Sequence, residues 1–232
     1  MNRNGENSDI KNILFFGFYI IFFIFVGLIL RSNLSNNKTT VDKYNSGYNK
    51  SFTLKDISKN NYHFNYELTK NGNTIIFDGD KYKNKQEFIK NGDYPEYYYS
   101  DDNNYYLRNN STLKYENVDN PIEFSKFIEI SNLEKIFVHS TYTSYTEYFT
   151  GKQIDYNYEI STTSLLRNID KIITDLDDLP NKISVESDDG KIYKINMDLT
   201  SYYKYFDDSI YEYKLTLTYT KYGDINEIKD LT

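Results

Sequence analysis

The chain has 232 residues, a net charge of −7 and no cysteine. The absence of cysteine excludes disulfides, thiolate metal sites, a cysteine nucleophile and the acylated cysteine of a bacterial lipoprotein. The acidic balance argues against nucleic acid and anionic lipid headgroups as partners, because both need a clustered basic surface. Alanine is absent, whereas Asn, Lys, Ile and Tyr are abundant, which resembles the coding bias of an AT-rich bacterial genome.

An uninterrupted apolar run, ILFFGFYIIFFIFVGLIL, follows a short polar tail of residues 1–12 and covers residues 13–30. As a helix this run reaches about 27 Å, which is close to the thickness of the hydrocarbon core of a bilayer. It exceeds the apolar part of a usual signal peptide, and no small-x-small cleavage site follows it. We therefore expect one transmembrane helix at Ile13 to Leu30 that anchors the protein in the cell membrane.

The polar stretch of residues 31–51 contains almost no aliphatic side chains, so it cannot bury enough surface to offset the entropy of ordering it. We expect a flexible stalk that holds the following domain, residues 52–232, on the order of 25 Å from the bilayer. Basic residues after the apolar run slightly favour a cytoplasmic domain, yet long domains cross membranes largely regardless of flanking charge. We expect this domain to be exported.

The first half of the domain has the pattern of a β-meander. Aromatic and aliphatic side chains alternate with polar ones from Tyr62 to Leu68, which is the period of a half-buried strand. Asn71 and Gly72 supply the positive φ angles of a tight turn, after which a second strand returns from Thr74 to Asp78. Further strands are expected at Gln86 to Lys90, Glu96 to Tyr99, Tyr105 to Arg108 and Leu113 to Glu116.

Helical patterns lie in the middle of the chain. Asn120 and Pro121 suit the start of a helix, because Asn can cap it and Pro needs no amide partner in the first turn. Apolar residues with helical spacing follow at Phe124, Phe127 and Ile128 and, in a second piece, at Leu133, Ile136 and Phe137, with Ser131-Asn132 as a candidate break between the two pieces. The strongest helix is expected to begin at Ser161 or Thr162, and its apolar face consists of Leu165, Ile169, Ile172, Ile173 and Leu176.

The remaining segments alternate again between apolar and polar residues. Strands are expected at Thr141 to Phe149, Ile154 to Ile160, Ile183 to Ser187, Lys191 to Asp198 and Tyr211 to Tyr219, and a turn at Gly223-Asp224 is expected to lead into a last strand at Asn226 to Leu231. Strands paired in adjacent hairpins, with helices grouped in the middle of the chain, predict an α+β domain. In this domain two or three helices cover one face of an antiparallel sheet.

Three pieces of sequence, FDGDKYKNKQEF, SVESDDGKIYKINMDL and LTLTYTKYGDINEIKDL, accompany this order of strands and helices. With that order they resemble the lipoprotein-carrier superfamily of LolA, LolB and LppX type, over roughly Phe52 to Leu231. The resemblance implies extracytoplasmic residence and a curved, half-barrel-like sheet plugged by helices. It also implies an apolar cavity that accepts acyl chains, and such a cavity would be lined by Phe124, Phe127, Leu165, Ile169 and Ile173.

No signature of catalysis, metal binding or nucleotide binding occurs in the sequence. His63 and His139 are far apart, and the nucleophile motif G-x-S-x-G is missing. Glycines occur singly in turns, so no phosphate-binding loop is expected. The acidic groups around Asp78 and Asp175 do not fit the calcium-loop pattern, which favours acidic turns over a metal site. We therefore expect no enzyme activity, no cofactor and no metal.

Runs of tyrosine at Tyr97 to Tyr99, Tyr105 to Tyr106 and Tyr202 to Tyr203 place rings on both faces of any strand. Rings that face away from the core could stack on sugars or bind a partner, unless the coding bias simply fills ordinary surface with tyrosine. Two non-catalytic functions follow. One is an exported, membrane-anchored protein that binds a lipid or another hydrophobic ligand in a cavity. The other is an envelope interaction module with a filled core, whose surface tyrosines contact a glycan or an envelope protein.

Overall fold

A computed structural model describes residues 52–102, 104–148, 152–174, 176 and 179–231. The chain separates into two units, Met1–Asp42 and Lys43–Thr232, and the described residues all belong to the second unit. The predicted tail, transmembrane helix and stalk fall on residues 1–51 and lie outside the described residues. Among the helices that are described, none combines the length and the apolar character needed to cross a membrane.

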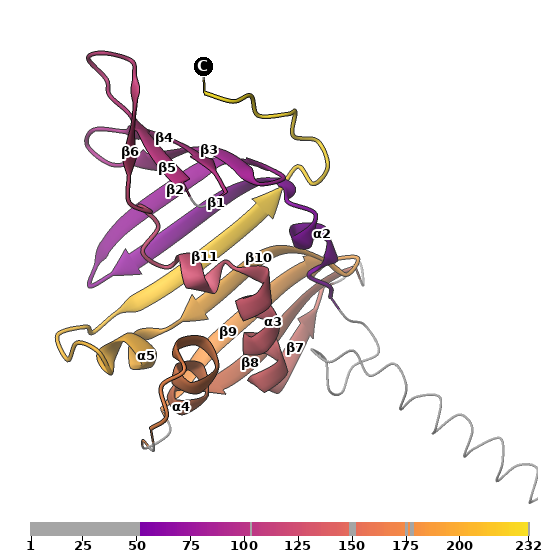
Figure 1. Cartoon of the computed structure of the whole chain (residues 1–232). Coiled ribbons are helices and arrows are strands. Elements are labelled where there is room, and N and C mark those ends of the chain that lie inside the picture. Colours follow the sequence, from indigo (N-terminus) through magenta and orange to yellow (C-terminus); the bar gives the residue numbers. More distant parts are fainter. Residues whose placement is uncertain (1–51, 103, 149–151, 175, 177–178, 232) are drawn as a thin grey trace, which may run out of the picture. The chain divides into compact units, whose positions relative to one another are not determined.

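Eleven strands of the described part form one antiparallel sheet in the order β6-β5-β4-β3-β2-β1-β11-β10-β9-β8-β7 (Figure 1). They are β1 (Asn61–Lys70), β2 (Asn73–Tyr82), β3 (Lys85–Asn91), β4 (Glu96–Asp101), β5 (Asn104–Arg108), β6 (Tyr115–Val118), β7 (Thr141–Glu147), β8 (Gln153–Ser161), β9 (Pro180–Asp188), β10 (Lys191–Asp198) and β11 (Tyr213–Thr220). Two meanders, β1 to β6 and β7 to β11, meet where the first strand pairs with the last. The sheet is curved and open, with β6 and β7 at its two edges (Figure 1).

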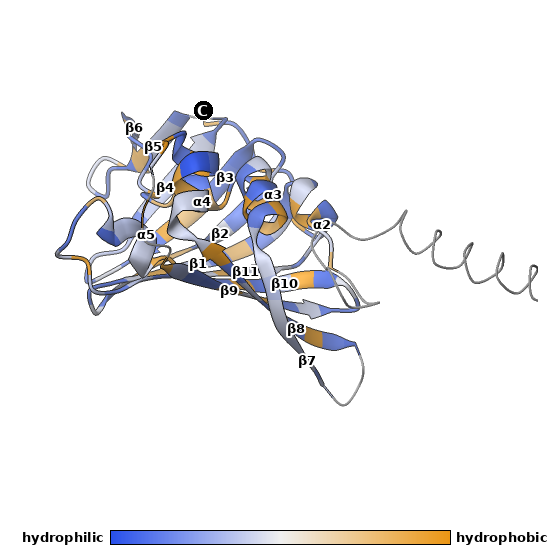
Figure 2. Cartoon of the chain, turned by 90° about the horizontal axis from the view of Figure 1, so that it is seen from below, coloured by the Kyte–Doolittle hydropathy of each residue, from blue (hydrophilic) through white to orange (hydrophobic). Residues whose placement is uncertain are grey.

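Short helices cover one face of the sheet. They are α2 (Lys55–Ser58), the 3₁₀-helix η1 (Ser125–Phe127), α3 (Ile130–His139), α4 (Thr162–Leu165), the π-helix η2 (Leu166–Asp170) and α5 (Thr200–Lys204). Helices α3 and α4 contact β8, and α5 contacts β9 and β11. Figure 2 shows α3, α4 and α5 on the same side of the sheet. We call this side the inner face and the opposite side the outer face. The predicted antiparallel α+β class, with a curved sheet and a few helices, is confirmed.

The core lies between the inner face and the helices, and strand alternation decides which side chains enter it. In β1, every second residue from Tyr62 to Leu68 is buried, as the sequence pattern predicted. Strand β11 adds a matching set, because Phe64 is paired with Tyr219 in the β1–β11 register. Aromatic rings then fill the space above the sheet: Phe64 stacks on Tyr66 with 4.5 Å between ring centroids.

Both central helices are shorter than their sequence patterns predicted. Asn120 Oδ1 accepts a hydrogen bond from the Ile122 amide at 2.9 Å, which makes a local turn. The three-residue η1 follows, and residues 128–129 separate it from α3, so the break lies before Ser131. Ser161 caps α4 as expected, accepting a hydrogen bond from the Ser164 amide. The helix then ends at Lys171, whose φ of 63° is left-handed. The residues after Lys171 therefore leave the predicted helical face.

Candidate functional site

The residues predicted to line a cavity lie mainly in the packed core. Phe124, Phe127 and Leu165 are fully buried. The Phe124 ring lies 5.8 Å from the Phe77 ring, and the Phe127 ring lies 5.4 Å from the Tyr202 ring, both measured between centroids. Contacts at these distances are those of packed aromatic cores, in which one ring occupies the space beside the next.

The two isoleucines of the predicted set behave differently. Ile169 is half-buried and packs against the core. Ile173 is 87% exposed, so its assignment to the inner face is wrong. The physical reason is the left-handed Lys171, which ends the helix two residues earlier and turns Ile173 toward solvent. None of these predicted lining residues borders the hollows described below.

A hollow of about 860 Å³ lies on the outer face, over β3 to β6. The strand register places three of its residues, Glu87, Tyr99 and Tyr106, side by side on neighbouring strands. The complete lining is Glu87, Tyr99, Asp101, Tyr106, Leu113, Lys114, Tyr115, Lys229, Asp230 and Leu231. Because residues 229–231 close one side, we call it the tail hollow.

The C-terminal segment after β11 forms this wall. It contains no strand among the described residues, so the predicted strand at Asn226 to Leu231 is wrong; side-chain contacts hold the segment instead. The Asn61 side chain exchanges two hydrogen bonds with the Ile225 backbone, at 3.3 and 3.0 Å. Lys85 Nζ donates to the Ile228 carbonyl and lies 2.6 Å from Asp230 Oδ1. The hydrogen bond to Asp230 raises the pKa of Lys85. Ile228 is buried, so the segment is anchored by an apolar side chain as well as by polar contacts.

Aromatic rings form the floor of the tail hollow. The ring centroid of Tyr99 lies 6.0 Å from that of Tyr106 and 6.4 Å from that of Tyr115. Burial raises the pKa of Tyr99, so its hydroxyl stays protonated at neutral pH. Tyr99 is itself buried, whereas Tyr106 and Tyr115 retain exposed surface. The ring surface that the hollow presents therefore comes from Tyr106 and Tyr115.

Leu113 stands on the rim of the tail hollow in an unusual backbone conformation. Its φ is 59°, which costs free energy for a side chain with a Cβ, and it is 60% exposed. Asn109 holds the turn in place, because its Oδ1 accepts from the amides of Ser111 and Thr112. This turn displaces the start of β6 to Tyr115, two residues later than predicted.

Charged groups of both signs surround the rings. Asp101 accepts from Asn84, and Asp230 pairs with Lys85, so both are already engaged. Within the described residues, the side chains of Glu87, Lys114 and Lys229 form no hydrogen bond or ion pair with another side chain. The tail hollow therefore offers free acceptors and free donors beside an aromatic surface, which suits a polar ligand with flat apolar faces.

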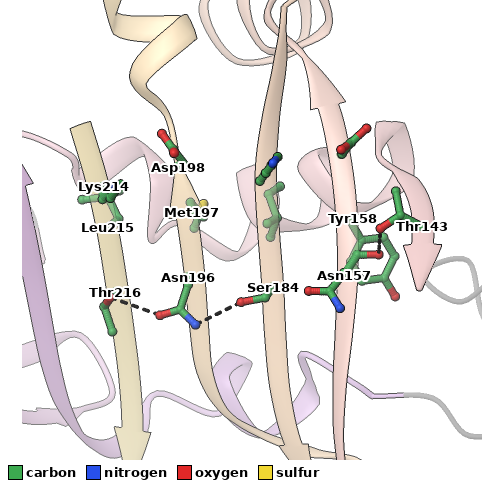
Figure 3. Close-up of a pocket in the computed structure, with 13 residues that line it drawn as sticks. Thr143, Asn157, Tyr158, Ser184, Asn196, Met197, Asp198, Lys214, Leu215 and Thr216 are labelled. Atoms are coloured by element: carbon green, nitrogen blue, oxygen red, sulfur yellow. Dashed lines mark hydrogen bonds between the residues drawn. The ribbon is translucent and has the colours of Figure 1, made fainter. Parts of the chain in front are cut away.

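A second outer-face hollow, of about 540 Å³, lies over β7 to β11 (Figure 3). Its polar side chains bind one another: Thr216 Oγ1 donates to Asn196 Oδ1 at 3.1 Å, and Asn196 Nδ2 donates to Ser184 Oγ at 3.0 Å. The hydrogen-bonding groups of Asn196 are thus already satisfied by neighbouring strands. This ladder stabilises the sheet and leaves fewer free groups for a ligand than the tail hollow.

His63, on β1, lies beside two acidic side chains, whereas His139 lies on α3. On the outer face, His63 Nδ1 lies 2.7 Å from Asp80 Oδ1, and its Nε2 lies 3.5 Å from Asp78 Oδ2. His139 ends α3 and borders a hollow of about 370 Å³ near α4. In the part of the chain that the structure describes, no group of three or more His, Asp or Glu side chains could hold a metal ion.

No protein-family model matches the chain, and no curated protein matches it. Among solved structures, the crystal structure of LprF from Mycobacterium bovis aligns with 76% of this chain and 94% of its own. The TM-score is 0.38 and the sequence identity is 10%, so the likeness is weak.

Proposed function

We propose that this protein is a non-catalytic binding protein, anchored in the membrane through Ile13 to Leu30, whose exported domain binds a saccharide in the tail hollow. One observation carries the proposal: the partly exposed rings of Tyr106 and Tyr115, packed against the buried Tyr99, line a hollow of about 860 Å³ that also holds unpaired charged groups. Sugar rings have apolar faces and polar edges. Tyrosine rings can pack on the faces, while Glu87 and Lys114 hydrogen-bond the hydroxyls.

The packing of the core favours this surface over a hydrophobic ligand between the sheet and the helices. A ligand beside Phe124 would have to separate its ring from that of Phe77. A ligand beside Phe127 would have to separate its ring from that of Tyr202. Opening a packed core exposes apolar surface to water, which costs a free energy of about 25 cal/mol for each Å². Hydrophobic-ligand binding, as the lipoprotein-carrier resemblance implies, is the alternative that the experiment below must separate from the proposal.

The test uses the full-length protein, purified in octaethylene glycol monododecyl ether, a detergent without a sugar headgroup, and a panel of immobilised oligosaccharides. Tyr115→Ala and Glu87→Gln should each weaken binding about tenfold, equivalent to about 1.4 kcal/mol. Tyr94→Ala is the matched control, because Tyr94 is 87% exposed and lies outside the lining of the tail hollow.

Failure of every oligosaccharide to bind, or equal binding by all variants, would contradict the proposal. Native mass spectrometry of the same preparation distinguishes saccharide binding from the alternative, hydrophobic-ligand binding. A lipid retained in one-to-one stoichiometry would support the hydrophobic-ligand function instead. Export is tested separately, by the access of an added protease to the domain in intact cells.

A further inference from the structure

A row of polar side chains crosses the inner face of β2, β3 and β4, on the side opposite to the tail hollow. The register pairs Lys81 with Gln86, and Gln86 with Ser100. Tyr62 and Tyr105 continue the row at its two ends. Directly cross-strand side chains have Cβ atoms about 5 Å apart, so these three polar groups are neighbours.

One polar group of this row, the Ser100 hydroxyl, is fully buried without a partner. Gln86 is also buried, and across the described residues its side chain makes no hydrogen bond. A buried polar group without a partner costs about 1–3 kcal/mol, so the unpaired Ser100 hydroxyl needs an explanation.

Lys81 adds a charge to this row. It is half-buried, and no carboxylate of the described residues pairs with it within 4 Å. Burial alone lowers the pKa of Lys81, with no contribution from a neighbouring acid. By contrast, Lys90 on the same face is paired with Glu96 at 3.1 Å. An ammonium group that is partly buried and has no carboxylate partner is stabilised by any anion that reaches it.

We propose that Lys81, Gln86 and Ser100 form a binding site for an oxyanion, the carboxylate or phosphate group of a small ligand. Lys81 supplies the charge, the Gln86 amide and the Ser100 hydroxyl supply donors, and the flanking tyrosines supply neutral hydroxyl groups. The apolar row formed by Phe88, Tyr98 and Leu107 lies beside the site and lowers the local dielectric. This site is independent of the tail hollow, which lies on the outer face.

The experiment measures binding of acetate and of inorganic phosphate to the full-length protein in dodecyl maltoside, with chloride replaced at constant ionic strength. Isothermal titration gives the dissociation constants, and the melting temperature should rise with the bound anion. Binding of acetate alone identifies a carboxylate site, and tighter binding of phosphate identifies a phosphate site. Either result supports the proposal.

Lys81→Met should weaken binding of the anion tenfold or more, and the anion should no longer raise the melting temperature of this variant. Without anion, Lys81→Met should melt at the same temperature as the natural protein or higher, because it removes an unpaired, desolvated charge. If Lys81 had a purely structural role, Lys81→Met would instead melt at a lower temperature than the natural protein. Ser100→Ala should weaken binding several-fold without lowering the melting temperature, and Lys182→Met, an exposed lysine on β9, is the control.

The proposal is overturned if neither anion binds, or if Lys81→Met and Lys182→Met bind equally. A Lys81→Met protein that melts below the natural protein in chloride would also overturn it, because the lysine would then be part of the packing.

Discussion

Lys126 and Asp170 form an ion pair that joins η1 to η2, with 2.9 Å between Nζ and Oδ1. Tyr202 of α5 completes the contact: Lys126 Nζ donates to its hydroxyl at 2.6 Å, and that hydroxyl donates to the other Asp170 oxygen. The Lys126 ammonium also lies 5.8 Å from the centroid of the Phe206 ring. Three short segments that are separate in the sequence are thereby linked above the sheet.

Asp170→Asn should destabilise the protein by about 2 kcal/mol, because it leaves a partly buried ammonium without its counter-charge. The Asp170 side chain is 17% exposed and that of Lys126 is 33% exposed. Asp230→Asn is the matched control: Asp230 pairs with Lys85 but is 76% exposed, so its loss should cost under about 1 kcal/mol. Thermal unfolding followed by circular dichroism measures both. Equal losses would show that the Lys126 pair is no more than a surface contact.

Gly79→Ala should destabilise the protein by about 3 kcal/mol, because β2 and β3 approach each other too closely for a methyl group at this position. A Cβ on Gly79 would lie 2.2 Å from the Glu87 carbonyl oxygen and 2.4 Å from Phe88 Cβ. Gly92→Ala should be nearly neutral, since nothing lies within 4 Å of its Cβ position. The same unfolding measurement compares them, and a well-folded Gly79→Ala protein would contradict the close approach.

Phe127→Ala should cost about 3–5 kcal/mol, because it removes a fully buried ring that packs against Tyr202. Ile173→Ala should change stability by less than about 0.5 kcal/mol, because Ile173 faces solvent. The pair distinguishes the observed short helix from the longer one that the apolar periodicity predicted. A large loss of stability for Ile173→Ala would contradict the short helix and support the longer one.

Stability should fall as the pH rises from about 10 to about 12. Burial raises the pKa of Tyr62 to about 12, whereas a tyrosine in the unfolded chain titrates near 10. Above pH 10 the unfolded state therefore binds fewer protons than the folded state, and the free energy of unfolding decreases. The stabilisation is complete below pH 10 and lost as the pH passes the folded value.

Tyr62→Phe should reduce this decrease by on the order of 2 kcal/mol across the interval. Tyr94→Phe, at an exposed position, should leave the pH profile unchanged. Chemical denaturation at several pH values between 9 and 12 provides the free energies. A profile that is the same for Tyr62→Phe and the natural protein would show that Tyr62 titrates normally.

Local patterns in the sequence were enough to identify most strands and the fold class. The alternation from Tyr62 to Leu68 appears in β1 as buried and half-buried residues in turn. Asn71 and Gly72, both with positive φ, make the turn between β1 and β2, as their residue types predicted. Burial of Phe124, Phe127 and Leu165 also followed from their spacing. Such features depend on neighbours within a few residues, which a single sequence displays directly.

The tertiary structure alone decided where polar and charged groups meet. Lys126 and Tyr202 are 76 positions apart, and the tail hollow combines β3 to β6 with residues 229–231. The lack of a partner for Lys81 depends on every strand and helix around it. Pairing between β1 and β11 brings the ends of the domain together, and no local period encodes which distant strands will pair. Long-range contacts depend on how the whole chain shares its buried surface, so these sites became visible only in the folded protein.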